Sequence, residues 1–291
     1  MQPKKPKKMK NPSYSSPNRQ NAPARDDTRQ KPSLPDNAAK ARGGLLLYGH
    51  HPVTAALSNP DRNCLHLFAT AQALEGLEAA ALPPLPPVTE LSRAQLDLML
   101  KSKQAESTAP PHQGLILLAK PLDQPDLSDI LHQLDQGKAA KRFLILDQVT
   151  DPRNVGAILR SARAFGAEAL IMTSRHAPEE TGALARAAAG ALEDVPIVRV
   201  NNLARALDAL RDNFVTLAGL SADADTPIDA LAATPHLGLL MGAEGSGLRR
   251  LTREACDVMA SIEMAKTSES LNVSVAAAIA LYATRFTAQA N

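Results

Sequence analysis

"FLILDQVTDPRNVGAILRSARAFGAEALIMTS", residues 143–174, joins two apolar runs through an amphipathic segment. The runs FLILDQV and EALIMTS have the length and the apolar content of buried strands. Between them, the apolar side chains recur at helical spacing and predict a helix over 155–165 with one buried face: Val155, Ile158, Leu159, Ala162 and Phe165. A strand, a helix and a second strand in this order predict a parallel β-α-β unit.

The same alternation continues toward the C-terminus. We expect helices over 180–191, 202–212, near 248–257 and over 271–286, and strands at PIVRV, FVTLAGL, HLGLLMG and VMASIEM. Apolar strands separated by helices are typical of a parallel sheet with helices on both faces. Ligands of such sheets bind beyond the carboxyl ends of the strands. Residues 141–291 are therefore predicted to form one α/β domain with a site at that edge.

Residues 43–120 predict a smaller α/β domain upstream. A strand over Leu45–Tyr48 precedes a helix that starts near Pro52, and CLHLFAT and GLILLAK predict further strands. The prolines of ALPPLPPV predict an extended connector between those two runs, because proline fixes its own φ and disfavours helix at the preceding residue. Residues 121–140 are expected to be a linker that contains a short helix, Leu127–Leu134.

The first 42 residues differ in composition from the rest of the chain. They hold 11 Lys and Arg against 3 Asp and Glu, whereas residues 43–291 hold 21 against 27. A basic segment rich in Pro, Ser and Asn is predicted to be disordered by itself, because it has too few apolar residues to form a core. It would serve either as a solubilising tail or as an electrostatic arm for nucleic acid.

Composition also excludes several classes of protein. No apolar run approaches the roughly 18 to 20 residues of a membrane-spanning helix, and MQPKKPKKMK is not followed by the apolar core of a signal peptide. We therefore expect a cytoplasmic protein without a membrane partner. Cys64 and Cys256 stand far apart, with no CxxC motif, so they are expected to be buried thiols rather than a disulfide or part of a metal site.

Two polar residues of the opening stretch lie off the predicted buried face of its helix. Asn154 and Arg160 are roughly 9 Å apart along a helix axis and about 120° apart around it, so they could flank a ligand beside the first turns. The alternatives are a helix cap for the asparagine and an ordinary surface position for the arginine.

Two further motifs follow. In LLMGAEGSGL, a buried strand breaks into glycines around Glu244, whose carboxylate could serve a cationic cofactor or a hydroxyl, or could be an acid at the start of a helix. In SESLNVSVAAAIALY, Ser270 and Asn272 precede an alanine-rich helix and could be caps or ligand contacts. The expected buried face of that helix follows i, i+4, i+7 and i+11 spacing: Leu271, Val275, Ala278 and Tyr282.

Together the three motifs resemble the SpoU (TrmH-like) family of RNA ribose 2'-O-methyltransferases, in the knotted SPOUT class. LDQVTDPRNVGAILRSARAFGA is similar to the first motif of the family, LLMGAEGSGLRRLTREACD to the second and SLNVSVAAAIALY to the third, over residues 143–286. YGHHPVTAAL and HQGLILLA make the upstream domain similar to the ribosomal-protein-like substrate-binding domain of the subgroup that methylates guanosine in 23S rRNA. The resemblance implies a parallel-sheet SPOUT domain with a deep trefoil knot, preceded by a small α/β domain and the disordered basic tail.

The resemblance also implies S-adenosylmethionine as the cofactor. Its pocket would use Gly219, Gly242, Ile262 and Leu271. The catalytic and substrate-contacting positions would be Arg160, Asn154, Glu244, Ser270 and Asn272. Two residues near the cofactor loop depart from the family pattern, since Glu263 stands where a proline is common and Lys266 where a small residue is usual.

The implied partners are RNA and a second copy of the chain in a homodimer, with no metal. The second domain favours rRNA over tRNA, which stays the main alternative substrate. A non-catalytic RNA-binding protein with this fold would have lost polar motif residues, and all five are present. A dinucleotide oxidoreductase would need a glycine-rich loop after the first catalytic-domain strand, where this chain has FLILDQVTDPRN.

Overall fold

A computed structural model describes residues 44–78, 82–101, 110–134, 140–175, 177–265 and 270–285. These residues all belong to one compact unit, residues 32–291. The predicted disordered tail, residues 1–42, lies outside the described residues. None of the described helices combines the length and the apolar character needed to cross a membrane.

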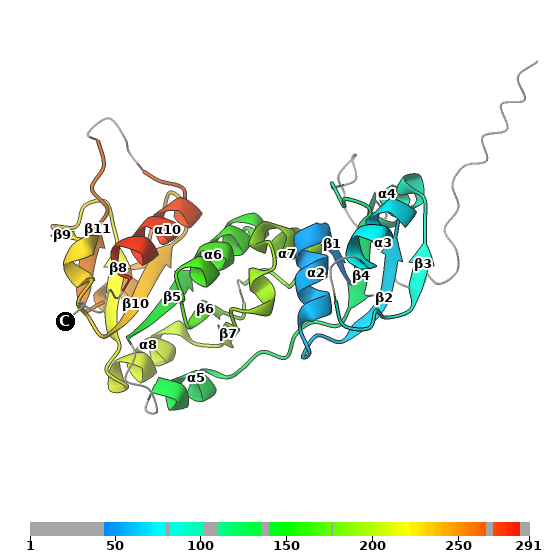
Figure 1. Cartoon of the computed structure of the whole chain (residues 1–291). Helices are drawn as coiled ribbons and strands as arrows, with labels where there is room; N and C mark the ends of the chain where they lie inside the picture. The colour runs from blue at the N-terminus through cyan, green and yellow to red at the C-terminus, as the bar shows by residue number, and fades with distance from the viewer. Residues whose placement is uncertain are drawn as a thin grey trace, which may run out of the picture. The chain divides into compact units, whose positions relative to one another are not determined.

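The larger sheet confirms the predicted parallel α/β domain (Figure 1). Its strands pair in parallel in the order β7-β6-β5-β10-β8-β11-β9. In chain order the strands are β5 (Lys141–Asp147), β6 (Ala169–Thr173), β7 (Ile197–Val200), β8 (Thr216–Leu220), β9 (Thr226–Pro227), β10 (His236–Gly242) and β11 (Val258–Ser261). The two-residue β9 was not predicted, because two residues carry no periodic pattern. The expected knot depends on the chain after β11, where residues 266–269 lie outside the described part, so it stays an expectation.

Helices cover both faces of this sheet. One apolar core holds α6 (Pro152–Ala164), α7 (Gly182–Ala188) and α10 (Val273–Ala283). A second core on the opposite face holds α5 (Leu127–Leu134) and α8 (Leu203–Asp212). The helix of the expected linker therefore packs on the sheet. The remaining elements are α9 (Arg250–Glu254) and two 3-10 turns, η2 (Ala191–Glu193) and η3 (Ile228–Leu231).

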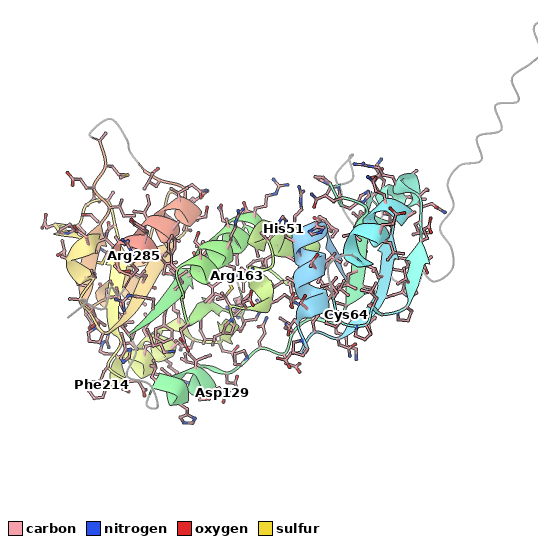
Figure 2. The ribbon with its side chains drawn as sticks, in the orientation of Figure 1. His51, Cys64, Asp129, Arg163, Phe214 and Arg285 are labelled. Carbon is pink, nitrogen blue, oxygen red and sulfur yellow. The ribbon has the colours of Figure 1, made fainter. Side chains whose placement is uncertain are left out.

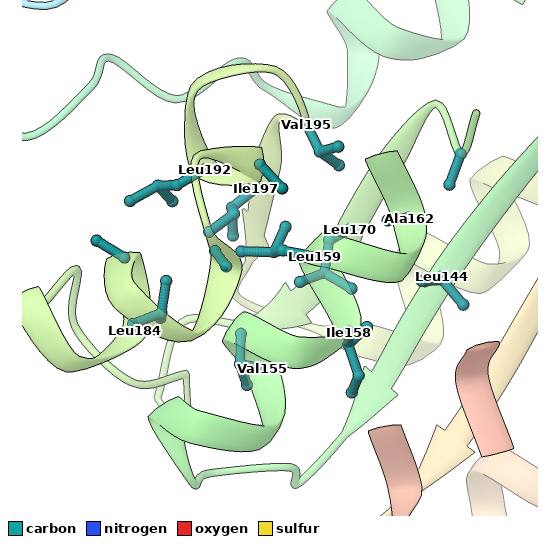
Figure 3. Close-up of a cluster of buried hydrophobic side chains, with 14 of the residues drawn as sticks. Leu144, Val155, Ile158, Leu159, Ala162, Leu170, Leu184, Leu192, Val195 and Ile197 are labelled. Atoms are coloured by element: carbon teal, nitrogen blue, oxygen red, sulfur yellow. The ribbon is translucent and has the colours of Figure 1, made fainter. Parts of the chain in front are cut away.

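Helix α6 begins three residues earlier than predicted. The carboxylate of Asp151 accepts a hydrogen bond from the backbone N–H of Arg153 at 2.8 Å, and Pro152 fits the first helical turn because that turn leaves its N–H groups unpaired. Val155, Ile158 and Leu159 are fully buried, as predicted, and Figure 3 shows them among apolar side chains of the neighbouring elements. Phe165 lies just beyond the helix, partly buried, with its ring against Tyr282.

The single helix expected over 180–191 is interrupted. Helix α7 ends at Ala188, and the chain then passes through Ala189 at φ 50° and Gly190 at φ 93° before the turn η2. Residues in this left-handed region cannot continue a right-handed helix. The alanine-rich sequence carried no signal for this break other than the glycine.

The prediction of which face of α10 is buried is wrong. The buried side chains are Val273, Ala277, Ala280 and Leu281. Val275 and Tyr282, expected in the core, are 46% and 54% exposed. Because α10 is apolar apart from Ser274 and the hydroxyl of Tyr282, its sequence offered no polar face from which to infer the buried one.

The small domain is a four-stranded sheet with helices (Figure 1). The strand order is β1-β4-β2-β3, antiparallel except for the parallel pair β2 and β3. Its elements are β1 (Leu45–Tyr48), α2 (His50–Ser58), β2 (Cys64–Ala69), α3 (Ala71–Glu78), β3 (Val88–Glu90), α4 (Arg93–Lys101) and β4 (Leu115–Ala119). Helices α3 and α4 and strand β3 were not predicted from the sequence.

A buried ion-pair network joins the small domain to the larger one. The side chain of Arg62 is fully buried, and its guanidinium contacts Glu180 at 2.6 Å and Glu193 at 2.7 Å. Strand β1 also lies against Gly182 at the start of α7, where a Cβ atom would come within 2.3 Å of the carbonyl oxygen of Leu46. The absence of a side chain at Gly182 therefore permits the close approach of α7 to β1.

Candidate active site

Three polar side chains, one from each sequence motif, meet at the carboxyl edge of the larger sheet. The amide nitrogens of Asn154 and Asn272 both donate to Oε1 of Glu244, at 3.1 Å and 2.6 Å. The Asn272 amide also donates to Oδ1 of Asn154 at 3.1 Å. The three residues are 28 to 118 positions apart in the chain. We call these three residues the polar triad.

Neighbouring strands position the triad. Strands β5 and β10 pair in parallel, so the segments that follow them begin at the same edge. Asn154 lies in the first turn of α6, shortly after β5. Glu244 lies in the loop 243–248 after β10, where Gly245 and Gly247 adopt φ values of 82° and 64° that favour glycine.

The structure decides between the alternatives left open by the sequence. Asn154 is not the cap of α6, since Asp151 takes that role. Glu244 is not an acid at the start of a helix, because α9 begins only at Arg250. Asn272 does both things: its Oδ1 caps α10 by accepting from the N–H of Ser274 at 2.9 Å, and its amide joins the triad.

Arg160 and Ser270 are not part of this cluster. Both side chains are exposed, and neither has a hydrogen bond or ion pair with another described residue. Arg160 lies on α6, beside a cavity of about 620 Å³ that His51, Arg163 and Arg186 also line. An exposed arginine without a protein partner keeps all its donors for a ligand.

The expected cofactor residues lie at the ends of neighbouring strands. Gly219 is the penultimate residue of β8, Gly242 is the last residue of β10, and Ile262 directly follows β11. Strands β10, β8 and β11 are adjacent in the sheet, so these three positions share its carboxyl edge. Leu271 directly precedes the cap of α10. Lys266 lies outside the described residues, whereas Glu263 lies inside them, two residues beyond β11.

The two glycines among them have different surroundings. A Cβ atom at Gly242 would lie 1.9 Å from the carbonyl carbon of Gly247, so the loop that carries Glu244 can fold back only onto a glycine. A Cβ atom at Gly219 would meet the sulfur atoms of Cys256 and Met259, both at 2.8 Å. Its side-chain direction is filled by protein, which leaves the backbone of Gly219 as the part that fits a cofactor contact.

Sequence reasoning missed the contacts through which Asp147 holds the loop that carries Glu244. Asp147, the last residue of β5, is 1% exposed, and its carboxylate accepts from the backbone N–H of Arg249 at 3.1 Å and from Nε of Arg249 at 2.7 Å. Gly242, at the other end of the loop, pairs with Asp147 in the sheet. Both ends of loop 243–248 are therefore held by one residue. The only sequence signal was an acid directly after the apolar run FLIL of β5.

The two cysteines are weakly reactive thiols. Burial raises the pKa of Cys256 to about 11 and also raises the pKa of Cys64, so both thiols stay protonated near neutral pH. In the described ranges, no three His, Cys, Asp or Glu residues gather as metal ligands.

Comparisons with known proteins identify the family of this chain. Residues 141–282 match the model of the SpoU rRNA Methylase family. A protein from Vibrio cholerae named 23S rRNA (guanosine-2'-O-)-methyltransferase RlmB is 41% identical over 244 residues, which are 81% of this chain and 94% of that protein. The chain belongs to the SpoU rRNA methylase family. A protein of the same name from Escherichia coli K12 is 40% identical over 243 residues, 81% of this chain and 96% of that protein.

Solved structures of SpoU methyltransferases share the fold. AviRb from Streptomyces viridochromogenes, in complex with the cofactor AdoMet, aligns with a TM-score of 0.66 at 25% identity, over 86% of this chain and 92% of its own. A putative RNA methyltransferase of the TrmH family from Porphyromonas gingivalis aligns with a TM-score of 0.67 at 24% identity, over 87% of this chain and 99% of its own. The second likeness is a likeness of fold alone.

Proposed function

We propose that this SpoU protein methylates the ribose 2'-hydroxyl of a guanosine in 23S rRNA, with S-adenosylmethionine as the methyl donor. The observation that carries the proposal is the polar triad, which joins one side chain from each of the three motifs at the carboxyl edge of the sheet. The names of the relatives at about 40% identity support guanosine in 23S rRNA as the target.

When bound, S-adenosylmethionine would supply a methyl group, whose bond to the sulfonium sulfur would break as its bond to the 2'-oxygen forms, with the hydroxyl proton passing to solvent water. The residues of this chain must then hold the hydroxyl and stabilise the negative charge that grows on its oxygen. Arg160 suits the second task, because it is an exposed cation without a partner among the described residues. A guanidinium keeps its proton in proteins, so we assign Arg160 to charge stabilisation and positioning rather than to proton removal.

The triad suits the first task. Both amides donate to Oε1 of Glu244, and Oε2 has no hydrogen bond within the described part of the chain. That oxygen is free to accept from a ribose hydroxyl or from Arg160. Asn154 and Asn272 hold the carboxylate in place. Ser270, three residues before the start of α10, is assigned to the floor of the substrate pocket.

The cavity beside Arg160 supports RNA as the substrate. His51, Arg163 and Arg186 line it together with Arg160, and none of its lining residues is Asp or Glu. Figure 2 labels His51 at the start of α2 and Arg163 on α6. Beyond residue 42 the chain holds more acidic than basic residues, so a cavity that three arginines and no acidic residue line is a local feature that fits a polyanion.

A methylation assay on two RNAs tests the proposal. The purified protein is incubated with methyl-labelled S-adenosylmethionine and either 23S rRNA or tRNA transcripts, and the RNA is digested and analysed by mass spectrometry. We expect 2'-O-methylguanosine from the 23S rRNA and none from the tRNA. Methylation of tRNA alone would establish the alternative substrate, and binding of RNA without methylation would identify a non-catalytic RNA-binding protein.

We further propose that the protein is a homodimer that uses the exposed apolar face of α10. Val275 and Tyr282 leave large apolar side chains exposed beside the small alanines of that helix, which suits close packing against a second copy. Light scattering should give the mass of two chains, and Val275→Glu should shift it toward one. A mass of one chain for the unaltered protein across the micromolar range would contradict the dimer.

A cytoplasmic location follows from the proposed rRNA substrate.

A further inference from the structure

A second arginine-lined cavity lies beside Arg249, the residue that follows the loop carrying Glu244. Its volume is about 630 Å³, and it lies between the ends of β6 and β7 and the starts of α8 and α9. Thr173 ends β6, Asn201 follows β7, and Arg249 precedes α9. The cavity therefore opens at the same carboxyl edge of the sheet as the polar triad.

The charge of this cavity fits an anion. Arg175, Arg249 and Arg250 line it, and no Asp or Glu is among its lining residues. Arg175 is exposed and makes no hydrogen bond or ion pair with any other described residue. Arg250 pairs with Glu254 at 2.6 Å, but both side chains are largely exposed, at 76% and 56%. An exposed pair of this kind contributes little, so a phosphate can replace the carboxylate.

An apolar surface beside these charges fits the flat face of a base. Leu251 is 66% exposed, and Leu203 and Leu207 form a buried floor behind it. The amide of Asn201, which has no hydrogen bond among the described residues, can donate to or accept from a base edge. A phosphate beside a splayed base is the combination that an unpaired RNA nucleotide offers.

Arg249 connects this cavity to the active site. Its side chain is 47% exposed and lines the cavity, while Nε and the backbone N–H are bound to the buried carboxylate of Asp147. The same Asp147 holds the loop of Glu244 at both ends. A nucleotide in the cavity would thus lie next to the loop that positions the reacting nucleotide.

We propose that this cavity binds an unpaired RNA nucleotide that flanks the methylated one, with its phosphate on Arg175 and Arg250 and its base on Leu251. The proposal rests on the proposed function, because it takes RNA as the substrate. It assigns roles to Arg175, which lies outside the three motifs, and to Arg250 and Leu251, which follow the glycines of the second motif. It also gives the arginines and the leucine separate, measurable contributions.

Binding of a fluorescent 23S rRNA fragment, measured by anisotropy at several salt concentrations, tests the proposal. Arg175→Ala should weaken binding roughly tenfold at low salt and lower the slope of log affinity against log salt by about 1, because one phosphate contact is lost. Leu251→Ala should weaken binding about threefold with an unchanged slope, because it removes an apolar contact. Both residues are exposed, so the fold should survive, which cofactor affinity by calorimetry checks.

Arg205→Ala is the matched control, since Arg205 is an exposed arginine of α8 that does not line the cavity. It should change neither affinity nor slope. Wild-type affinity and slope in both Arg175→Ala and Leu251→Ala would overturn this proposal and leave the proposed function standing. If the unaltered protein binds no RNA, both proposals fail. If it binds but does not methylate, the anisotropy result still decides the role of the cavity.

Discussion

Replacing Arg160 with alanine should lower the rate constant of methyl transfer by about 10²- to 10³-fold, because one positioned cation is lost where negative charge develops. The affinity for S-adenosylmethionine should not change. Arg160 is exposed on α6, whereas the expected cofactor residues lie at the ends of β8, β10 and β11. Single-turnover methylation and calorimetry with the cofactor measure the two quantities separately. Equal losses of rate and of cofactor affinity would contradict this division of roles.

Arg163→Ala is the control on the same helix. Arg163 lines the same cavity as Arg160 and pairs with Asp194 at 2.8 Å, with both side chains about half exposed. Its loss should raise KM for RNA and leave kcat unchanged, because the role proposed for Arg163 is to contact the RNA backbone and not the reacting oxygen. Arg160→Lys separates stabilisation from proton removal. A lysine gives up its proton more readily than an arginine, so a rate that rises with pH in this variant would favour the base role.

Asp147→Asn should lower kcat by about a hundredfold with little change in cofactor affinity. The asparagine cannot accept from Nε and the backbone N–H of Arg249 through two equivalent oxygens, so the end of loop 243–248 loses its anchor. Glu244 then moves relative to Asn154 and Asn272, and a small misplacement of a positioning group is costly in rate. The free energy of unfolding should fall by about 1–3 kcal/mol. The fall should be no larger, because the guanidinium of Arg249 is half exposed and water can solvate it.

A double-mutant cycle identifies the route of this effect. If Asp147 acts by positioning Glu244, the variant with both Asp147→Asn and Glu244→Ala should be no slower than Glu244→Ala alone. Asp257→Asn is the matched control, because Asp257 also accepts from a backbone N–H, that of Leu217, and from an arginine, Arg211, but at the opposite edge of the sheet. It should lower stability and leave kcat unchanged. Additive losses in the cycle would show that Asp147 does not act through Glu244.

The sequence by itself determined the class of fold and most of its elements. The alternation of short apolar runs with amphipathic segments located the strands β5, β6, β7, β8, β10 and β11, and the expected bounds of α5 match the structure. This succeeded because burial imposes a period on the side chains of each element, and a period can be read without knowledge of the neighbours. The three motifs likewise carried the family, which the comparisons confirm.

Only the tertiary structure decided how those elements use their side chains. The buried face of α10, the meeting of Asn154, Glu244 and Asn272, and the hold of Asp147 on Arg249 were all undetermined by the sequence. The face of α10 carries no polar contrast, so its orientation depends on what packs against it. The triad and the Asp147 anchor join residues far apart in the chain, and their contacts exist because β10 pairs with β5. Strand order is set by the packing of the whole sheet, which no single segment encodes.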